Sequence, residues 1–407
     1  MPSDFFANYL EFSGGNEAPK LFHRWSAIGM VGAYMGRQVF FRFGDSKLHT
    51  NQFIMLLGSA GTKKNTAINM AKKLVKAAGY SSIAAEKTSK EKFLQDMGED
   101  KSDNQGNMLD QDLWGEISEL DYRERWICKG EFNDFFAANI LDFLSMLGEL
   151  WDFEGPYDSK IKHGASPIIP NPTISILGGN TPTTFASTFP AEAMGQGFLS
   201  RVIAVHAKPT GEKITWPKIP DDKEREELIK KLAAMKTHCL GEMTCGEGAA
   251  ELIDKIYKRW KPVPDVRFEN YGNRRLVHLI KLGMIMAVTR QSMVIEKVDV
   301  VRANTVLHHT EQFMPDAYGE YGMSRNSAQI VKILKILDDT PGLTHAELWA
   351  KLQSDFDKID NFVTCVSGMC HAGKIQNHSE RIYPVKRIVM PVTNDMLDYG
   401  YLSKEEL

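Results

Sequence analysis

Short apolar runs alternate with helical patterns along the first half of the chain. The runs predict strands at 38–43, 51–57, 125–129, 173–177 and 202–206. Apolar positions recur with helical spacing over most of residues 1–38 and again at 66–78 and 140–151. This alternation of strands and helices favours an α/β fold, in which a mostly parallel sheet is covered by flanking helices.

The second half of the chain has a different pattern. Prolines at positions 217, 220, 262 and 264 separate helices expected at 223–236, 247–261 and 274–290. Further helices are expected at 328–337, 345–352 and 359–372, followed by a hairpin around 381–385. Three short helices and a hairpin predict a C-terminal winged-helix domain.

The strongest chemical signal lies at Phe53–Thr66, where a buried strand runs into a glycine-containing loop and then into a helix. Such a loop lets backbone N–H groups approach phosphates, and the helix N-terminus favours an anion. Lys64 is expected to reach the β- and γ-phosphates of a nucleotide. The alternative is an ordinary strand–turn–helix with a solvated lysine pair. The predicted nucleotide-binding residues are Gly58, Ser59, Ala60, Gly61, Thr62, Lys63, Lys64, Asn65 and Thr66.

Glu131 follows a second short apolar strand and is expected to be the general base of a nucleotide hydrolase. Asn65 and Glu131 are the expected protein ligands of Mg²⁺. Asn65 stands where the phosphate-loop pattern has Ser or Thr, Lys63 where it has a second glycine, and Gly130 where a metal-side Asp is expected. These departures put the hydrolysis rate in question more than nucleotide binding. The alternative role of Glu131 is a helix cap or a salt bridge.

Two further polar residues lie at strand ends. Asn180 ends the buried strand that begins near residue 173, and it is placed to orient an attacking water. Arg201 precedes the strand at 202–206 and is placed to enter a neighbouring subunit's site as an arginine finger. The alternatives are a turn asparagine and a surface arginine.

In this order, the segments GSAGTKKNT, ICKGEFNDF, GGNTP and GFLSR resemble the Walker A, Walker B, sensor 1 and arginine-finger motifs of AAA+ ATPases. The likeness is to minichromosome-maintenance-like helicases and related P-loop ATPases of bacteriophages and prophages. Residues 274–284 and 295–303 are similar to the helical lid of that family, which implies that Arg274 is its sensor-2 arginine.

The resemblance implies four regions. These are an N-terminal helical region at 1–45, an AAA+ ATPase core at 46–215, a helical lid at 216–322 and a winged-helix domain at 323–407. It also implies ATP and Mg²⁺ as cofactors.

Basic residues suggest where single- or double-stranded DNA would bind. In the resembled helicases a basic hairpin before sensor 1 faces the central pore, which corresponds here to Lys160, Lys162 and His163. The C-terminal segment offers Lys374, Arg381, Lys386 and Arg387 as a basic wing. The alternatives are a solvated loop and a wing that binds protein.

Composition narrows the protein class. With 43% apolar and 25% charged residues, the chain is neither disordered nor fibrous. The net charge of −3 gives no general affinity for nucleic acid. No apolar run approaches the ~20 residues that span a bilayer, so we expect no membrane partner. The five cysteines lack zinc-ligand spacing, and with no secretory signal they predict a cytoplasmic protein, in a host cell if phage-encoded.

These features lead to three hypotheses. The first is an ATP-dependent DNA helicase or translocase of a phage or mobile element, acting as a homo-oligomeric ring, with six subunits expected. The second is an AAA+ replication initiator or helicase loader with weak ATPase activity. The third is a structural module with a vestigial nucleotide site.

Overall fold

The computed structural model describes residues 4–99, 121–158, 167–189, 197–263, 265–318, 325–371 and 374–385. The contacts divide the chain into two compact units. Unit 1 contains the described residues up to Tyr318, and unit 2 contains those from Arg325 to Val385. The predicted border at 322/323 lies within a gap between described residues.

A four-stranded parallel sheet forms the centre of unit 1. Its strand order is β4 (Arg123–Lys129), β7 (Pro172–Asn180), β3 (Phe53–Leu57) and β8 (Val202–His206). Every residue of β3 and β7 is buried, which explains why β3 is continuously apolar, whereas β7 also buries the polar residues Thr173, Ser175 and Asn180. Leu57 pairs with both Asn180 and His206, so the carboxyl ends of three strands share one edge. The predicted α/β class with a parallel sheet and flanking helices is confirmed.

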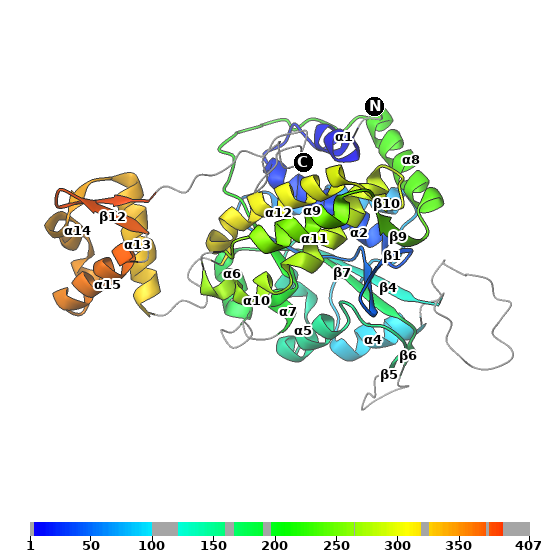
Figure 1. The fold of residues 1–407 in the computed structure, drawn as a ribbon, viewed down its shortest axis with the longest axis horizontal. Helices are drawn as coiled ribbons and strands as arrows, with labels where there is room; N and C mark the ends of the chain where they lie inside the picture. Colours follow the sequence, from blue (N-terminus) through cyan, green and yellow to red (C-terminus); the bar gives the residue numbers. More distant parts are fainter. Residues whose placement is uncertain are drawn as a thin grey trace. The chain divides into compact units, whose positions relative to one another are not determined.

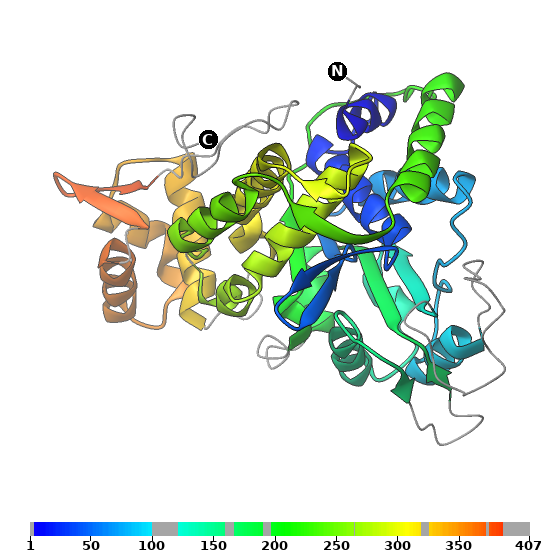
Figure 2. The same ribbon diagram turned by 45° about the vertical axis from the view of Figure 1, so that its right-hand side comes forward.

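Helices cover both faces of this sheet. α2 (Lys20–Met35) packs against α3 (Lys64–Ala77) and against β7 and β3. α12 (Lys297–Ala317) packs against both β8 and α11 (Arg275–Thr289). In the views of Figures 1 and 2, α11 and α12 lie on one side of the sheet, whereas α4 (Lys90–Glu99) and α5 (Ile140–Glu149) lie on the other.

A second sheet joins distant parts of unit 1. Its order is β10 (Val294–Ile295), β9 (Gly241–Cys245), β1 (Val39–Phe43) and β2 (Ser46–His49), and only the β1–β2 pair is antiparallel. Residues 216–322 were expected to be helical, yet they contribute β9 and β10 to this sheet. Backbone pairing between β1 and β9 therefore fixes the predicted lid region to the N-terminal region within one unit.

Among the helices of the described residues, none has the length and apolar character needed to cross a membrane.

The remaining elements of unit 1 are short or peripheral. The further helices are α1 (Phe5–Phe12), η1 (Phe132–Phe135), α6 (Pro182–Thr188), α7 (Gly197–Ser200), α8 (Asp222–His238), α9 (Ala249–Arg259), η3 (Val266–Phe268) and α10 (Glu269–Gly272). β5 (Tyr157–Asp158) and β6 (Ile168–Ile169) form a small antiparallel pair.

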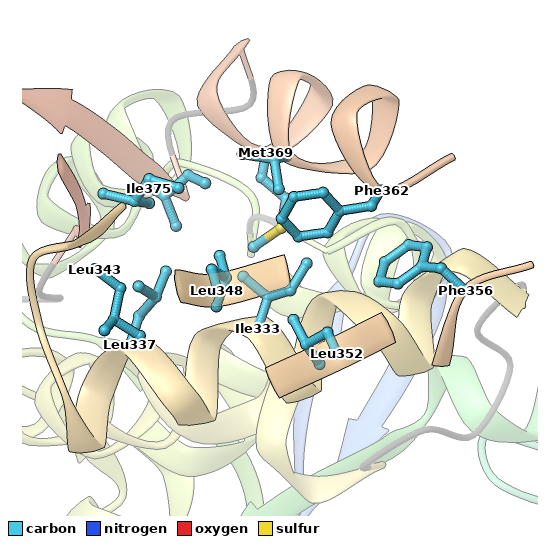
Figure 3. Packing of buried hydrophobic residues seen from close by; sticks show 11 residues of the cluster. Ile333, Leu337, Leu343, Leu348, Leu352, Phe356, Phe362, Met369 and Ile375 are labelled. Atoms are coloured by element: carbon cyan, nitrogen blue, oxygen red, sulfur yellow. The ribbon is translucent and has the colours of Figure 1, made fainter. Parts of the chain in front are cut away.

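Unit 2 contains three helices and a three-stranded antiparallel sheet. The helices are α13 (Arg325–Asp339), α14 (His345–Leu352) and α15 (Ile359–His371), with a short η4 (Gln353–Asp355) after α14. The sheet order is β11 (Leu343–Thr344), β13 (Arg381–Pro384) and β12 (Ile375–His378). Apolar side chains from all three helices and from the sheet meet in a single core (Figure 3).

Candidate nucleotide-binding site

The loop between β3 and α3 has a conformation suited to an anion. A Cβ at Gly58 would lie 2.8 Å from the Ala207 carbonyl oxygen, so this position requires glycine. Gly61 has a φ of 84° with open space where a Cβ would point, and it therefore leaves one side of the loop accessible. The loop ends at the N-terminus of α3, where the first backbone N–H groups lack helical acceptors.

Lys64 is the buried cation of this loop. Its side chain is only 5% exposed, and its Nζ donates to the carbonyl oxygens of Gly58 at 2.8 Å and Ser59 at 3.1 Å. Burial lowers the pKa of Lys64, while the charge of Glu131 raises it. The ammonium group is thus folded into the loop, and a bound phosphate would replace the two carbonyl oxygens as its acceptor.

Asn65 and Gly130 lie directly against each other beside this lysine. A Cβ at Gly130 would be only 1.9 Å from Asn65 Oδ1, so the asparagine side chain requires glycine at position 130. Glu131 is exposed and lies between the end of β4 and the start of η1. Among the described residues, no three His, Cys, Asp or Glu side chains are grouped to hold a metal ion.

Asn180 lies at the buried end of β7, opposite Leu57 in the sheet. Its Nδ2 donates to Asn133 Oδ1 at 2.9 Å, whereas its Oδ1 is buried and has no hydrogen-bond partner among the described residues. A buried acceptor without a partner costs about 1–3 kcal/mol, so this oxygen is suited to accept a hydrogen bond from a water or a ligand. Asn133 was missed in the sequence, although it stands only two positions after Glu131.

A pocket of about 460 Å³ opens at the same edge of the sheet. It lies where the carboxyl ends of β3, β7 and β8 meet, the usual position of ligand sites in open α/β sheets. Burial lowers the pKa of His206 in its wall. The lining residues are Ser59, Ala60, Thr181, Pro182, Thr183, His206, Ala207, Lys208 and Pro209.

Arg201 and Arg274 meet at another place in unit 1. Both guanidinium groups lie over the ring of Trp151, at 5.7 Å and 5.9 Å from its centroid. Arg201 immediately precedes Val202, which pairs with Phe53 at the amino end of β3. The five-residue length of β3 separates this position from the loop between β3 and α3, about 16 Å along the sheet. Arg201 is therefore at the opposite edge from Lys64 of the same chain.

Trp151 is the centre of a cationic cluster that the sequence did not predict. The Lys281 Nζ lies 4.0 Å from the ring centroid and donates to Asp152 at 2.6 Å and Asn51 at 2.8 Å. Burial, reinforced by the neighbouring charge of Arg274, lowers the pKa of Arg201. The available signal in the sequence was a lysine at position 281 within the otherwise apolar stretch 279–288.

The adjacent Arg275 has a different role from Arg274. It is buried, and its guanidinium donates to Glu311 Oε1 at 2.7 Å and to Asn304 Oδ1 at 2.8 Å. These bonds join α11 to α12, so Arg275 is a structural residue. Of the two neighbouring arginines, Arg274 is the one that lies beside Arg201, over the Trp151 ring.

The predicted DNA-binding residues are only partly described. Lys160, Lys162, His163, Lys386 and Arg387 lie outside the described residues. Lys374 is exposed just before β12, and Arg381 begins β13, where its Nη1 donates to the Gly342 carbonyl oxygen at 2.8 Å. The exposed side of α15 carries Ile359 and Val363 and no lysine or arginine. Of the residues predicted to bind DNA, the structure therefore describes only Lys374 and Arg381.

Comparisons with protein-family models and with curated proteins found no match for this chain. The interpretation of the site therefore depends on its own residues and geometry.

Proposed function

We propose that the chain is an AAA+ ATPase that acts on DNA as an oligomeric ring, as a helicase or translocase. The observation that carries this proposal is the order of polar groups along one sheet edge. Lys64 follows β3, Asn180 ends β7 and Glu131 follows β4, and these three strands are adjacent. A phosphate-binding loop, a water-orienting amide and a carboxylate base are the groups that hydrolysis of a nucleoside triphosphate requires.

The proposed oligomer follows from the position of the two arginines. Arg201 lies at the amino edge of the sheet and cannot reach the phosphates at Lys64 of its own chain. A second copy that presents Arg201 and Arg274 to this Lys64 would complete the site. Such a head-to-tail contact uses two different surfaces and closes into a ring when the rotation permits.

The residues near Lys64 suit a magnesium ion that is held mainly by the nucleotide. Asn65 Oδ1 and the Glu131 carboxylate are oxygen ligands of the kind that Mg²⁺ prefers, and phosphates and water would supply the others. Mg²⁺ would neutralise charge on the phosphates when it is bound. Glu131 would accept the proton of the attacking water, and Asn180 would orient that water.

A second function is favoured by the Asn65–Gly130 contact. With asparagine at position 65 and glycine at position 130, the site has neither a Ser or Thr hydroxyl nor a carboxylate at these two places. Slow hydrolysis would suit an initiator or helicase loader, in which bound nucleotide controls assembly.

The decisive experiment measures ATP turnover by the full chain with and without single-stranded DNA. We expect turnover that rises on addition of DNA, together with displacement of a labelled strand. Glu131→Gln is the control, because it removes the base but retains the phosphate contacts. Tight ATP binding with negligible turnover would favour the switch, and absence of ATP binding would contradict both functions.

A further inference from the structure

Glu17 connects the phosphate loop to a distant segment of unit 1. Its Oε2 lies 3.0 Å from the Lys63 Nζ, and its Oε1 accepts the Ile214 N–H at 3.0 Å. The Thr210 hydroxyl also donates to the Glu17 carbonyl oxygen at 3.2 Å. The Ile214 N–H, followed by the Lys63 ammonium, lowers the pKa of Glu17 and keeps it ionised. One ionised side chain therefore contacts both segments.

Lys63 has an unusual backbone at this contact. Its φ of 58° is in the left-handed region, at the position where the phosphate-loop pattern has glycine. A lysine there costs conformational energy that glycine would not, and its side chain is directed to Glu17. Residue 63 thus attaches the loop to Glu17 in addition to shaping it.

The segment on the other side of Glu17 is the strap, residues 207–221, which connects β8 to α8 (Figure 1). Its first residues line the pocket beside Ser59 and Ala60, and the Lys218 N–H donates to the Gly15 carbonyl oxygen. Between these two attachments the strap presents Trp216, which is 87% exposed. Pro217 restricts the backbone directly after it.

We propose that Trp216 stacks on the purine base of the nucleotide whose phosphates bind at Lys64. This inference rests on the proposed function and adds a base-binding residue to it. Lys63 and Ile214 share one carboxylate, and Trp216 is two residues beyond Ile214, a span of at most about 7 Å. The backbone of Trp216 is therefore near the Glu17–Lys63 contact, on the side to which we expect the base of a bound triphosphate to extend.

An indole is chemically suited to this role. Stacking on a base needs an accessible aromatic face and no specific hydrogen bonds to the base. An exposed tryptophan offers a large ring for this contact, so its contribution to binding affinity is large. The three most deeply buried tryptophans of unit 1, Trp25, Trp126 and Trp151, have no such face available. The Glu17 contacts favour a nucleotide base over a DNA base or a second copy of the chain, because they hold Ile214 and the strap beside the phosphate loop.

The test compares ATP with inorganic tripolyphosphate, which has the phosphates but no base. Binding of each to the full chain is measured by calorimetry for the wild type, Trp216→Ala, Trp216→Phe and Ile219→Ala. Ile219 is a matched control, because it is 86% exposed on the same strap. We expect Trp216→Ala to weaken ATP binding about tenfold and to leave tripolyphosphate binding unchanged. Trp216→Phe should retain most of the ATP affinity, and Ile219→Ala should retain all of it.

The other outcomes overturn the proposal in distinguishable ways. Equal weakening of both ligands by Trp216→Ala would mean that the residue acts through the phosphate loop. Unchanged ATP affinity, with loss of oligomer or of single-stranded DNA binding, would make Trp216 a subunit or DNA contact. If the wild type binds neither ATP nor tripolyphosphate, the proposed function fails as well.

Discussion

The side chain of Asn65 fills the space in which a side chain at position 130 would begin. Its Oδ1 is 1.9 Å from the place of a Cβ on Gly130, a separation that real Cβ atoms do not tolerate. Two of the three departures from the usual phosphate-site pattern, Asn65 and Gly130, are therefore one structural feature. An asparagine on α3 and a glycine after β4 depend on each other sterically, although 65 residues separate them.

This dependence predicts strong coupling between substitutions at the two positions. Gly130 does not have a positive φ, so alanine is compatible with the backbone and only the contact with Asn65 opposes it. We expect Gly130→Ala to lower the free energy of unfolding by about 1–2 kcal/mol, as overpacking commonly does. In an Asn65→Ala background the same change should cost at least about 0.5 kcal/mol less. Urea unfolding of the four proteins measures this coupling, and additive effects would contradict it.

Lys64→Ala should weaken ATP binding at least about tenfold. The substitution removes the buried ammonium group that donates to the Gly58 and Ser59 carbonyl oxygens, and hydrogen bonds to a charged group contribute about 1.5–3 kcal/mol. Calorimetry measures the affinity, and circular dichroism checks the fold. Lys73→Ala is the control because Lys73 is exposed on the same helix. Wild-type affinity in Lys64→Ala would exclude the loop as the phosphate site.

Arg201→Ala should bind ATP normally but lose hydrolysis by roughly 10³–10⁵-fold, the range for arginine fingers. ATP binding should be normal because Arg201 lies over Trp151, at the sheet edge opposite Lys64 of its own chain. Hydrolysis should be lost because the site of the neighbouring subunit would lack this arginine. Glu131→Gln should be equally inactive by itself. A mixture of the two variants should recover part of the activity, since some interfaces then pair an intact Glu131 with an intact Arg201. Mixed oligomers without any recovered activity, or a fully active monomer, would argue against action between subunits.

Acidification should destabilise unit 1 below about pH 6.5, before most carboxylates titrate. Burial lowers the pKa of His278 from 6.5 to about 3, helped by the charge of Lys281, and burial lowers that of His23 to about 4. The unfolded chain therefore takes up protons that the folded chain excludes. Stability from these groups is fully present above pH 6.5 and is lost as the pH falls toward 3.

Each such histidine contributes up to about 1.4 kcal/mol per pH unit in this window. His278→Phe keeps an aromatic ring between Trp151 and Tyr271 and should reduce the slope by about that amount. Unfolding measured between pH 7 and pH 4.5 gives the slope. His238→Phe serves as the comparison because His238 is exposed. An unchanged slope in His278→Phe would show that this side chain takes up its proton in the folded state.

Local patterns in the sequence predicted the centre of the molecule. The apolar run at 53–57 and the glycines that follow it indicated the strand, the loop and the start of α3, because strand burial and backbone freedom are local properties. The order of apolar strands and helices also indicated the parallel sheet. Asn180 was recognisable as the polar end of a buried strand, and Glu131 as the residue after another.

Only the tertiary structure decided which distant residues meet. The register of β3 with β8 places Arg201 at the far edge from Lys64, and the packing of α11 brings Arg274 and Lys281 to the ring of Trp151. The same holds for Asn65 against Gly130, for Glu17 between Lys63 and Ile214, and for β9 beside β1. Each contact joins segments far apart in the chain and arises from packing and strand pairing, whereas periodicity and local motifs report only on neighbouring residues.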